Sequence, residues 1–219
     1  MAESFYARVL SLPLFQGVSS GDLLRLAGTA KFDFRTERGG KLLTAQDETC
    51  QSLLFLIAGE VEAERLEDGW ALSEVVRAPS VLGVDCLFGL SVRHTHSLRA
   101  RGNVSLLETD KRTVREVLLQ NATFRINYLN LLSSRVQKLR MWAAQPLPDI
   151  AAGRLARFLR PLCLNETGEK RLCVRQVDLA RLLALPVETL AHTLQVMNRK
   201  GLLQTGRGRL VIPQLETLG

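Results

Sequence analysis

The sequence has few cysteines, histidines and aromatic residues, and these shortages exclude several classes of site. Its 219 residues include four cysteines and three histidines, and the aromatic share is 5%. The cysteines, at positions 50, 86, 163 and 173, form no CxxC pair, so zinc-knuckle and iron–sulfur spacing are absent. Scattered cysteines are typical of reduced thiols in a cytoplasm, which is the location we expect.

Signals for export, membrane insertion and common catalytic chemistry are absent too. The opening stretch MAESFYARVLSLPLF lacks the basic start and long apolar core of a signal peptide. No apolar run reaches the ~18 residues that a membrane span needs. The sequence has no Walker lysine loop and no GxSxG nucleophile elbow. We therefore expect a binding protein without a membrane partner, and not an enzyme.

What the chain does have is positive charge, concentrated near its C-terminal end. The net charge is +7 and the isoelectric point is about 9.7. Residues 149–219 contain eleven Lys and Arg against six Asp and Glu, a net +5, which leaves +2 for the other 148 residues. A basic segment of this kind suits phosphate binding, although charge alone does not distinguish it from a basic surface without a partner.

This basic segment contains two short amphipathic helices that meet at a tight corner. The first is predicted over Arg175–Leu183, and four of its side chains should face inward: Val177, Leu179, Ala180 and Leu183. The corner is residues 184–186, where Pro186 suits the first turn of the next helix. The second helix is predicted over Val187–Lys200 and ends before Gly201. Its buried residues should be Leu190, Leu194 and Met197.

A basic β-hairpin is predicted directly after the helix pair. Leu202–Thr205 and Arg209–Ile212 are β-prone runs separated by the turn Gly206-Arg207-Gly208. A second helix followed by such a wing can enter the DNA major groove while the wing contacts phosphate. An ordinary helical pair with a hairpin is the alternative reading, and the order of these elements favours DNA binding.

The first half of the chain is predicted to be mainly β-structure. Short helices are expected over Ser4–Leu10 and Ser19–Ala27. Between residues 30 and 109, short β-like runs are broken by glycines, and the clearest are Ser52–Ile57, Val61–Glu64, Leu72–Val76 and Val104–Glu108. Gly59 is expected to bend the chain between the first two. Many short strands at this spacing favour an antiparallel sandwich or barrel.

Helices return after Asp110, which should cap a helix over Lys111–Gln120. The longest predicted helix is Thr123–Ala144, and its apolar residues at spacings of three and four form a dimer seam: Leu129, Leu132, Val136, Leu139 and Ala143. Packing of the helix on its own sheet is the alternative, and Tyr128 and Leu131 offer a face for it. A break at Gln145–Asp149 follows, and Asp149 should cap a helix that reaches Leu162.

The order of these elements resembles the catabolite activator and fumarate–nitrate regulator (CRP/FNR) family of bacterial transcription regulators over nearly the whole chain. The matching segments are Leu14-Phe15, residues 56–61, Leu98-Arg99-Ala100, Asp149 with Arg154, and Glu188-Thr189-Leu190. The resemblance implies an α+β fold with an N-terminal antiparallel β-roll, a long dimerisation helix and a C-terminal winged helix-turn-helix. The domains would be residues 1–122, 123–145 and 149–219. Double-stranded DNA, a second copy of the chain and RNA polymerase would be the partners.

The resemblance also places an effector pocket in the β-roll, and this sequence departs from the family pattern there. The pocket residues would be Gly83, Val84, Asp85, Cys86, Arg93, His94 and Thr95. Members that bind cyclic nucleotides have Glu after the first Gly and Arg before the hydroxyl residue. Here Val84 and His94 occupy these positions, and Asp85 and Arg93 are one residue away, which on a strand is the opposite face. We therefore expect neither cyclic AMP nor, without N-terminal cysteines, an iron–sulfur cluster, and the effector stays unknown.

Two metal-based alternatives depend on the same segment. His94, His96 and Cys86 are each competent axial ligands, so the chain could be a haem- or metal-based sensor of the same fold. His94-Thr95-His96 also resembles the metal motif of cupin enzymes. A cupin would need a further Glu, and residues 97–107 contain none.

The second helix of the pair carries the expected DNA readers. Val187, Glu188, Thr189 and His192 would face bases, and Val187 and His192 replace two arginines of the best-known family members. Glu188 can accept from cytosine N4, and Thr189 can contact a phosphate or a thymine methyl. The expected phosphate contacts are Arg175, Arg199, Lys200, Arg207 and Arg209. A dimer should bind a palindromic sequence. The remaining alternative is a sensor module whose main partner is a protein. Such a module would bind DNA weakly and without sequence preference.

Overall fold

A computed structural model describes residues 7–148 and 150–218, and its contacts divide the chain into two units. Unit 1 comprises Met1–Glu62 and Val76–Gln137, and unit 2 comprises Ala63–Val75 and Lys138–Gly219. Each unit has an apolar core of its own. The fold class is α+β, as predicted. None of the described helices is long and apolar enough to cross a membrane.

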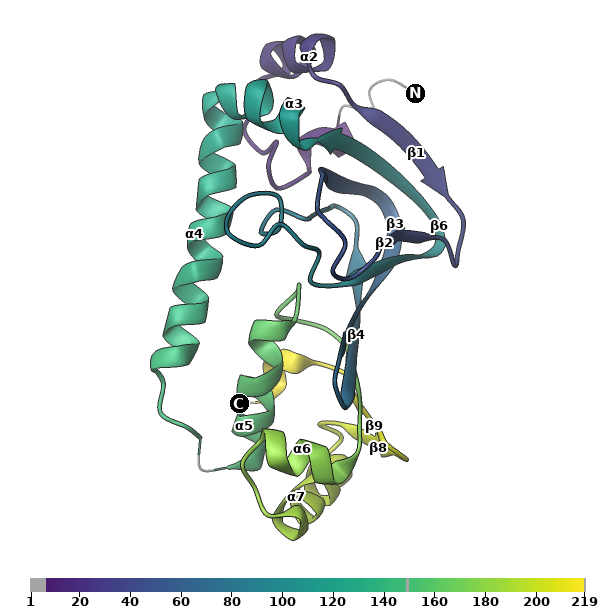
Figure 1. The fold of residues 1–219 in the computed structure, drawn as a ribbon, viewed down its shortest axis with the longest axis vertical. Coiled ribbons are helices and arrows are strands. Elements are labelled where there is room, and N and C mark those ends of the chain that lie inside the picture. The colour runs from purple at the N-terminus through teal and green to yellow at the C-terminus, as the bar shows by residue number, and fades with distance from the viewer. Residues whose placement is uncertain (1–6, 149, 219) are drawn as a thin grey trace. The chain divides into compact units, whose positions relative to one another are not determined.

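Unit 1 is built on an antiparallel sheet, which confirms the β-structure predicted for the first half of the chain (Figure 1). Its strands are β1 (Asp33–Glu37), β2 (Leu42–Thr44), the first part of β3 (Ser52–Glu67), β5 (Ser80–Leu82) and β6 (Ser97–Asp110). β6 pairs with β1 and β2, and β3 pairs with β5. The buried side chains of this sheet, among them Leu53, Phe55 and Leu107, fill the core of the unit.

The predicted bend at Gly59 is wrong, because β3 is one continuous strand of 16 residues. Gly59 lies within it at φ +91°, where β6 passes very close. A Cβ atom on Gly59 would lie 2.5 Å from the carbonyl oxygen of Asn103. The glycine is therefore required by the close approach of a distant strand, a cause that the local sequence does not reveal.

The helices of unit 1 begin where their capping residues predict. Residues 7–10 are helical, and α2 (Ser20–Thr29) begins after Ser19, whose hydroxyl accepts from the Asp22 N–H at 3.1 Å. Asp110 caps α3 (Lys111–Glu116) in the same way, at 2.7 Å from the Thr113 nitrogen. The single helix predicted to Gln120 is interrupted at Val117 and continues as a 3₁₀ turn over Leu118–Gln120.

The long helix α4 (Ala122–Ala144) is confirmed, and its first turns are anchored in the core of unit 1. Phe124 is buried against Phe15, with ring centroids 5.1 Å apart in an edge-to-face arrangement. The Asn127 side-chain amide donates to the carbonyls of Leu14 and Gln16. The Leu14-Phe15 turn is thereby fixed to α4.

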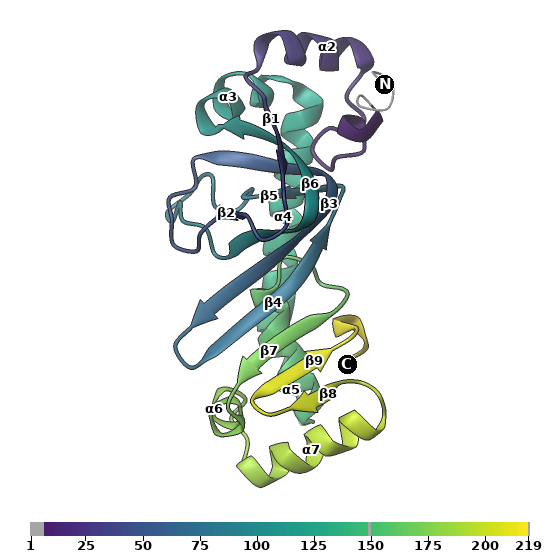
Figure 2. The same ribbon diagram turned by 90° about the vertical axis from the view of Figure 1, so that its right-hand side faces the viewer.

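Unit 2 contains the second part of β3, the end of α4, and further antiparallel strands and α-helices. The strands lie in the order β4 (Trp70–Arg77), β7 (Lys170–Val174), β9 (Arg209–Ile212) and β8 (Gln204–Gly206), side by side in Figure 2. The helices are α5 (Ala151–Leu159), α6 (Gln176–Leu182) and α7 (Val187–Arg199), and 3₁₀ turns cover Arg160–Leu162 and Leu215–Thr217. Asp149, predicted to cap α5, lies outside the described residues.

A buried ion pair fixes β4 to β7 in unit 2. The Lys170 Nζ atom lies 2.6 Å from the Glu74 carboxylate, and both side chains are 1% exposed. Lys170 also donates to the Thr167 carbonyl, and Glu74 accepts from the backbone N–H groups of Leu164 and Asn165. Because an unpaired buried charge is costly, only the observed register, with Glu74 opposite Lys170, satisfies both groups.

Removing one member of this pair should destabilise unit 2 strongly. Glu74→Ala leaves the Lys170 ammonium buried without its counter-charge, and we expect a loss of about 3–5 kcal/mol in the free energy of unfolding. Urea unfolding can be followed by tryptophan fluorescence, because Trp70 and Trp142 both belong to unit 2. Adding Lys170→Met to Glu74→Ala should recover part of the loss. An unfolding midpoint for Glu74→Ala equal to that of the wild type would contradict this role.

Candidate nucleic-acid interface

The helix pair α6 and α7 is held at its corner by backbone hydrogen bonds and one arginine. After α6, the N–H groups of Ala184 and Leu185 return to the carbonyls of Arg181 and Ala180, which ends the helix with Ala184 at φ +52°. The Arg154 guanidinium on α5 donates to the carbonyls of Leu183 and Ala184. These bonds stabilise a left-handed conformation that residues other than glycine rarely adopt.

The end of α7 has the same arrangement with the expected glycine. Gly201 lies at φ +70°, and the N–H of Leu202 donates to the Met197 carbonyl at 3.0 Å. The predicted buried residues Leu190, Leu194 and Met197 all lie in the core of unit 2. Val177 is the exception in the helix pair, because its side chain is 54% exposed instead of facing inward.

The outer face of α7 carries three of the four predicted base readers. Glu188, Thr189 and His192 are exposed, with Glu188 in the first turn of the helix. Val187 is half-buried and packs against the core of unit 2, so less of its side chain is free for a base. Gln195 extends the face by a further turn and was missed by the sequence reasoning, although its spacing of three from His192 is the signal that places it there.

The predicted phosphate contacts are all exposed cations around α6, α7 and the wing. Arg199 and Lys200 stand at the end of α7, and Arg207 and Arg209 belong to the β8–β9 hairpin, whose strands pair as predicted. Within the described part of the chain, none of these four forms an ion pair. Arg175 instead pairs with Asp178 at 2.5 Å, which raises the pKa of Arg175 and lowers that of Asp178 through their hydrogen bond.

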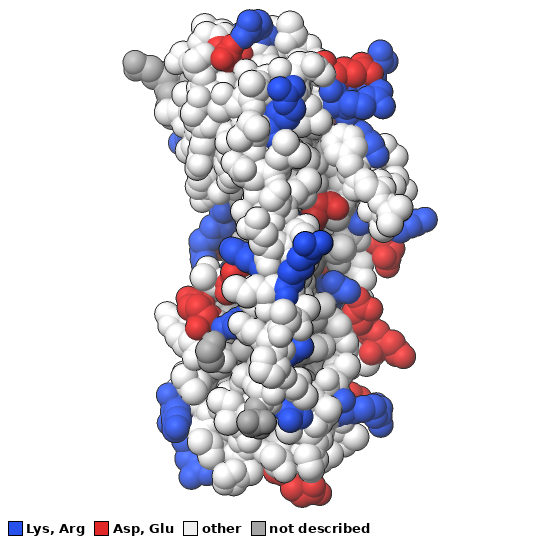
Figure 3. All heavy atoms as spheres, turned by 90° about the vertical axis from the view of Figure 1, so that its left-hand side faces the viewer, with Lys and Arg blue, Asp and Glu red and all other residues white. Residues whose placement is uncertain are grey.

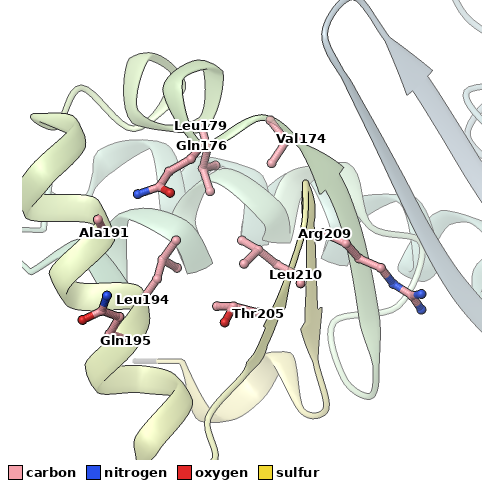
Figure 4. Close-up of a pocket in the computed structure, with 10 residues that line it drawn as sticks. Val174, Gln176, Leu179, Ala191, Leu194, Gln195, Thr205, Arg209 and Leu210 are labelled. Atoms are coloured by element: carbon pink, nitrogen blue, oxygen red, sulfur yellow. The ribbon is translucent and has the colours of Figure 1, made fainter.

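A groove lies between α7 and the wing, as Figure 4 shows. Its volume is about 260 Å³, and its apolar floor is formed by Val174, Leu179, Ala191, Leu194 and Leu210. Gln176, Gln195 and Thr205 supply the polar groups of its lining. The groove thus separates the two elements that were expected to contact DNA.

The dimer seam predicted on α4 is mostly exposed to solvent. Leu129, Val136 and Leu139 are 45–51% exposed, and Ala143 is exposed as well. Leu132 is half-buried and packs against the core of unit 1 with Leu131, so this position serves the chain's own core. Figure 3 faces α4 and shows a surface that is mostly uncharged, with Lys and Arg interspersed.

The predicted effector segment is fastened to α4 within unit 1. The Tyr128 hydroxyl donates to the Val84 carbonyl at 2.8 Å, and Asp85 forms an ion pair with Arg135 at 3.0 Å. Gly83 lies at φ +84°, and Val84 and Cys86 are 1% and 5% exposed. Burial raises the pKa of Tyr128, so its hydroxyl keeps the proton that it donates.

The second part of this segment is arranged along the loop before β3. The His94 N–H donates to the Glu48 carbonyl, and the Arg93 guanidinium donates to the Asp47 carbonyl at 2.6 Å. Arg93 and Thr95 are exposed, whereas His94 is half-buried beside Gly83. The Arg93 side chain is therefore engaged with the backbone of the loop between β2 and β3.

The three candidate metal or haem ligands have environments that favour their neutral forms or a protein partner. Burial raises the pKa of the Cys86 thiol to about 11, helped by the nearby Asp85 carboxylate. His96 is 5% exposed, with Nδ1 2.9 Å from the Thr95 hydroxyl. In the described part of the chain, no three His, Cys, Asp or Glu residues are placed to hold a metal ion. A cupin-type site with three protein ligands is therefore not found among the described residues.

Two family models match the chain in tandem. The model described as the cyclic nucleotide-binding domain matches residues 35–121, and the model described as the Crp-like helix-turn-helix domain matches residues 153–219. A comparison with curated protein sequences gives no match. The second match covers α5, α6, α7 and the wing, and the first covers most of the sheet of unit 1.

Solved structures show the same fold at low sequence identity. The catabolite activator protein of Thermus thermophilus is 20% identical, with a TM-score of 0.52, over 94% of this chain and 96% of that one. The sensor domain of the transcriptional regulator DNR from Pseudomonas aeruginosa is 20% identical, with a TM-score of 0.51, over 65% and 98%. The N-terminal domain of a transcriptional regulator from Streptomyces coelicolor is 20% identical, with a TM-score of 0.52, and the match covers 65% of this chain and 98% of that one.

The half-buried His94 should make the stability of unit 1 depend on pH. Burial lowers the pKa of His94 below the ordinary value of about 6.5, although Glu48 and Asp85 oppose the shift. The unfolded chain then binds this proton more readily than the folded chain. Stability is therefore fully present above about pH 6.5 and declines as the pH falls below it. The urea concentration at the unfolding midpoint, followed by circular dichroism, should decrease when the pH is lowered from 7.5 to 5.5. His94→Gln should make this decrease smaller. An equal decrease in both proteins would exclude His94 as a cause.

Proposed function

The chain belongs to the CRP/FNR family of transcription regulators, and we propose that it acts as a homodimer that binds a palindromic DNA operator. The family consists of DNA-binding regulators and not of enzymes. The observation that carries the proposal is the outer face of α7, with Glu188, Thr189 and His192 exposed on a helix fixed by its corner and its end. The match of residues 153–219 to the Crp-like helix-turn-helix model supports the use of this face on DNA.

The dimer is supported by the exposed apolar part of the seam. Leu129, Val136 and Leu139 recur at intervals of seven and three on one face of α4, the spacing of a coiled-coil interface. Leaving three large apolar side chains about half exposed on one helix face is unfavourable in water. Pairing with the same face of a second copy covers them. Two α7 helices in a symmetric dimer can then enter successive major grooves, about 34 Å apart.

DNA is read in this proposal by few side chains. The Glu188 carboxylate accepts from cytosine N4, and Thr189 contacts a phosphate or a thymine methyl group. His192 stands one turn beyond Glu188 and borders the same groove edge. Arg199, Lys200, Arg207 and Arg209 contact the backbone, because they are exposed cations around α7 and the wing. Val187 contributes packing more than readout, since it is half-buried.

Regulation in this proposal runs from the effector segment to α4. Val84 and Asp85 are tied to Tyr128 and Arg135 of that helix, so a ligand that moves the segment also moves α4. The segment at residues 145–149 then orients the helix-turn-helix in one of two ways. Because Val84 brings no carboxylate to the ribose and His94 no fixed charge to the phosphate, cyclic AMP is not the proposed effector. A ligand acts only through different affinities for the two states.

Introducing a charge into the seam should dissociate the dimer. Leu139→Asp places a carboxylate where two copies of α4 meet, and we expect a monomer in sedimentation velocity at micromolar concentration. The matched control is Met141→Asp, because Met141 is 54% exposed and lies on the other side of the helix. The control should stay dimeric. A Leu139→Asp protein that sediments like the wild type would place the interface elsewhere.

Substitution of Glu188 should relax the operator at one position of each half-site. Selection from a random duplex library by the wild-type protein should enrich a palindrome, and by Glu188→Ala the same palindrome with the cytosine preference lost at one symmetric position. Each lost contact should cost about 1–3 kcal/mol of discrimination. An identical motif from both proteins would remove Glu188 from the readout, and no motif from the wild type would overturn the proposed function.

A further inference from the structure

An apolar cavity lies in unit 1, between its N-terminal helices and the sheet. The cavity has a volume of about 280 Å³ and is bounded by the helical residues 7–10, α2, β1 and β6. All seven side chains that line it are apolar: Val9, Leu23, Ala27, Ala30, Phe32, Phe34 and Leu107. None of these seven belongs to the effector segment at residues 83–95, so the cavity is a separate site.

The cavity has a buried floor and an exposed rim. Val9, Leu23 and Leu107 are 2–4% exposed and belong to the core of unit 1. At the rim, Ala27 is exposed and Phe34 is 59% exposed. Phe34 lies opposite Leu107 in the β1–β6 register, so both side chains project from the same face of the sheet. A molecule that enters past Phe34 therefore meets the core.

Two phenylalanines determine which shape of molecule fits the cavity. Phe32 and Phe34 both line it, and they are separated by the exposed Asp33. Positions two apart on an extended strand face the same side and are about 6.6 Å apart, close to twice the ~3.5 Å contact distance between carbon atoms. A flat ring placed between the two side chains can contact both. A flexible alkyl chain would lose conformational entropy in the same place.

The size and chemistry of the lining narrow the class of ligand further. None of the seven lining side chains can form a hydrogen bond or supply a counter-charge. Burying an ionised group against them would cost more than its apolar part gains. The volume of about 280 Å³ is nearly twice that of an apolar cavity of about 150 Å³ that holds benzene. The cavity therefore suits an uncharged molecule larger than a single ring.

We propose that this cavity binds a neutral aromatic molecule of two fused rings. One ring lies between Phe32 and Phe34, and the other packs on Leu23 and Leu107. Aromatic pairs of this kind add to the affinity that the buried area supplies. A small polar group on the ligand can stay at the exposed rim. The proposal concerns binding to unit 1 alone and does not depend on DNA binding by α7.

The walls of the cavity are already held in place by contacts within unit 1. The Phe32 ring lies 6.4 Å from the ring of Phe15, which lies 5.1 Å from that of Phe124 at the start of α4. The Thr109 hydroxyl donates to the Lys31 carbonyl at 3.0 Å, which fixes the residue before Phe32 to the end of β6. A preformed site of this kind spares the ligand part of the cost of ordering the protein.

The experiment titrates the full chain without DNA at pH 7 and follows binding by isothermal titration calorimetry. The probe is 2-naphthol, and we expect saturable binding of one molecule per chain. 2-Naphthoate has the same rings and a carboxylate, and it should bind at least about tenfold more weakly because the lining offers no counter-charge. 1-Octanol is apolar but flexible, and it should also bind more weakly than 2-naphthol.

Three variants locate the bound molecule. Ala27→Phe fills the rim and should abolish binding of 2-naphthol. The matched control is Leu24→Phe, because Leu24 is 58% exposed on the same helix and does not line the cavity. The control should bind like the wild type. Phe34→Ala should weaken binding roughly three- to tenfold through the loss of one aromatic contact. Circular dichroism checks that each variant is folded, and all three positions are exposed.

Several results would overturn the proposal. Absence of saturable 2-naphthol binding by the folded wild type would exclude the site. Equal affinity of the wild type and Ala27→Phe, or loss of binding in Leu24→Phe as well, would place the ligand elsewhere. Equal affinity for 2-naphthoate or 1-octanol would contradict the proposed class of ligand. None of these results bears on the proposed function, which is tested separately with DNA.

Discussion

The arrangement of unit 2 depends on the buried pair of Lys170 and Glu74. Two opposite charges, each almost fully removed from water, can be accommodated only while they face each other, and this fixes β4 on β7. β7 in turn pairs with β9, and β9 pairs with β8, so the wing inherits its position from the same register. α6 begins two residues after β7 ends. One electrostatic constraint thus positions the wing and the start of the helix pair together.

In the function that we propose, only a few side chains contact DNA, and most of the fold is held by buried apolar residues. The buried residues of α7 hold the helix in the core, and its exposed residues are left to read DNA. The same division applies to the effector segment, where Val84 and Cys86 are buried while Asp85 reaches Arg135 of α4. In the proposed function, an exposed residue such as His192 can therefore change the operator without altering the fold.

Local signals made much of this structure predictable from the sequence. Ser19 and Asp110 accept the hydrogen bonds that their positions before a helix predict, and Gly201 ends α7. The features that were not predicted depend on residues far apart in the chain. The local sequence predicts a bend at Gly59 because it does not reveal the close approach of Asn103, and Glu74 and Lys170 are separated by 96 residues. The groove around Gln195 likewise exists only once the wing has folded beside α7.

The central claim is that two copies of this chain bind one palindrome through two α7 helices. Sedimentation velocity of the full chain with the selected duplex, and with a duplex whose second half-site is scrambled, tests it most directly. The account predicts a complex of two chains per intact palindrome, and clearly weaker binding to the duplex with one half-site. One chain per intact duplex, or equal affinity for both duplexes, would contradict it.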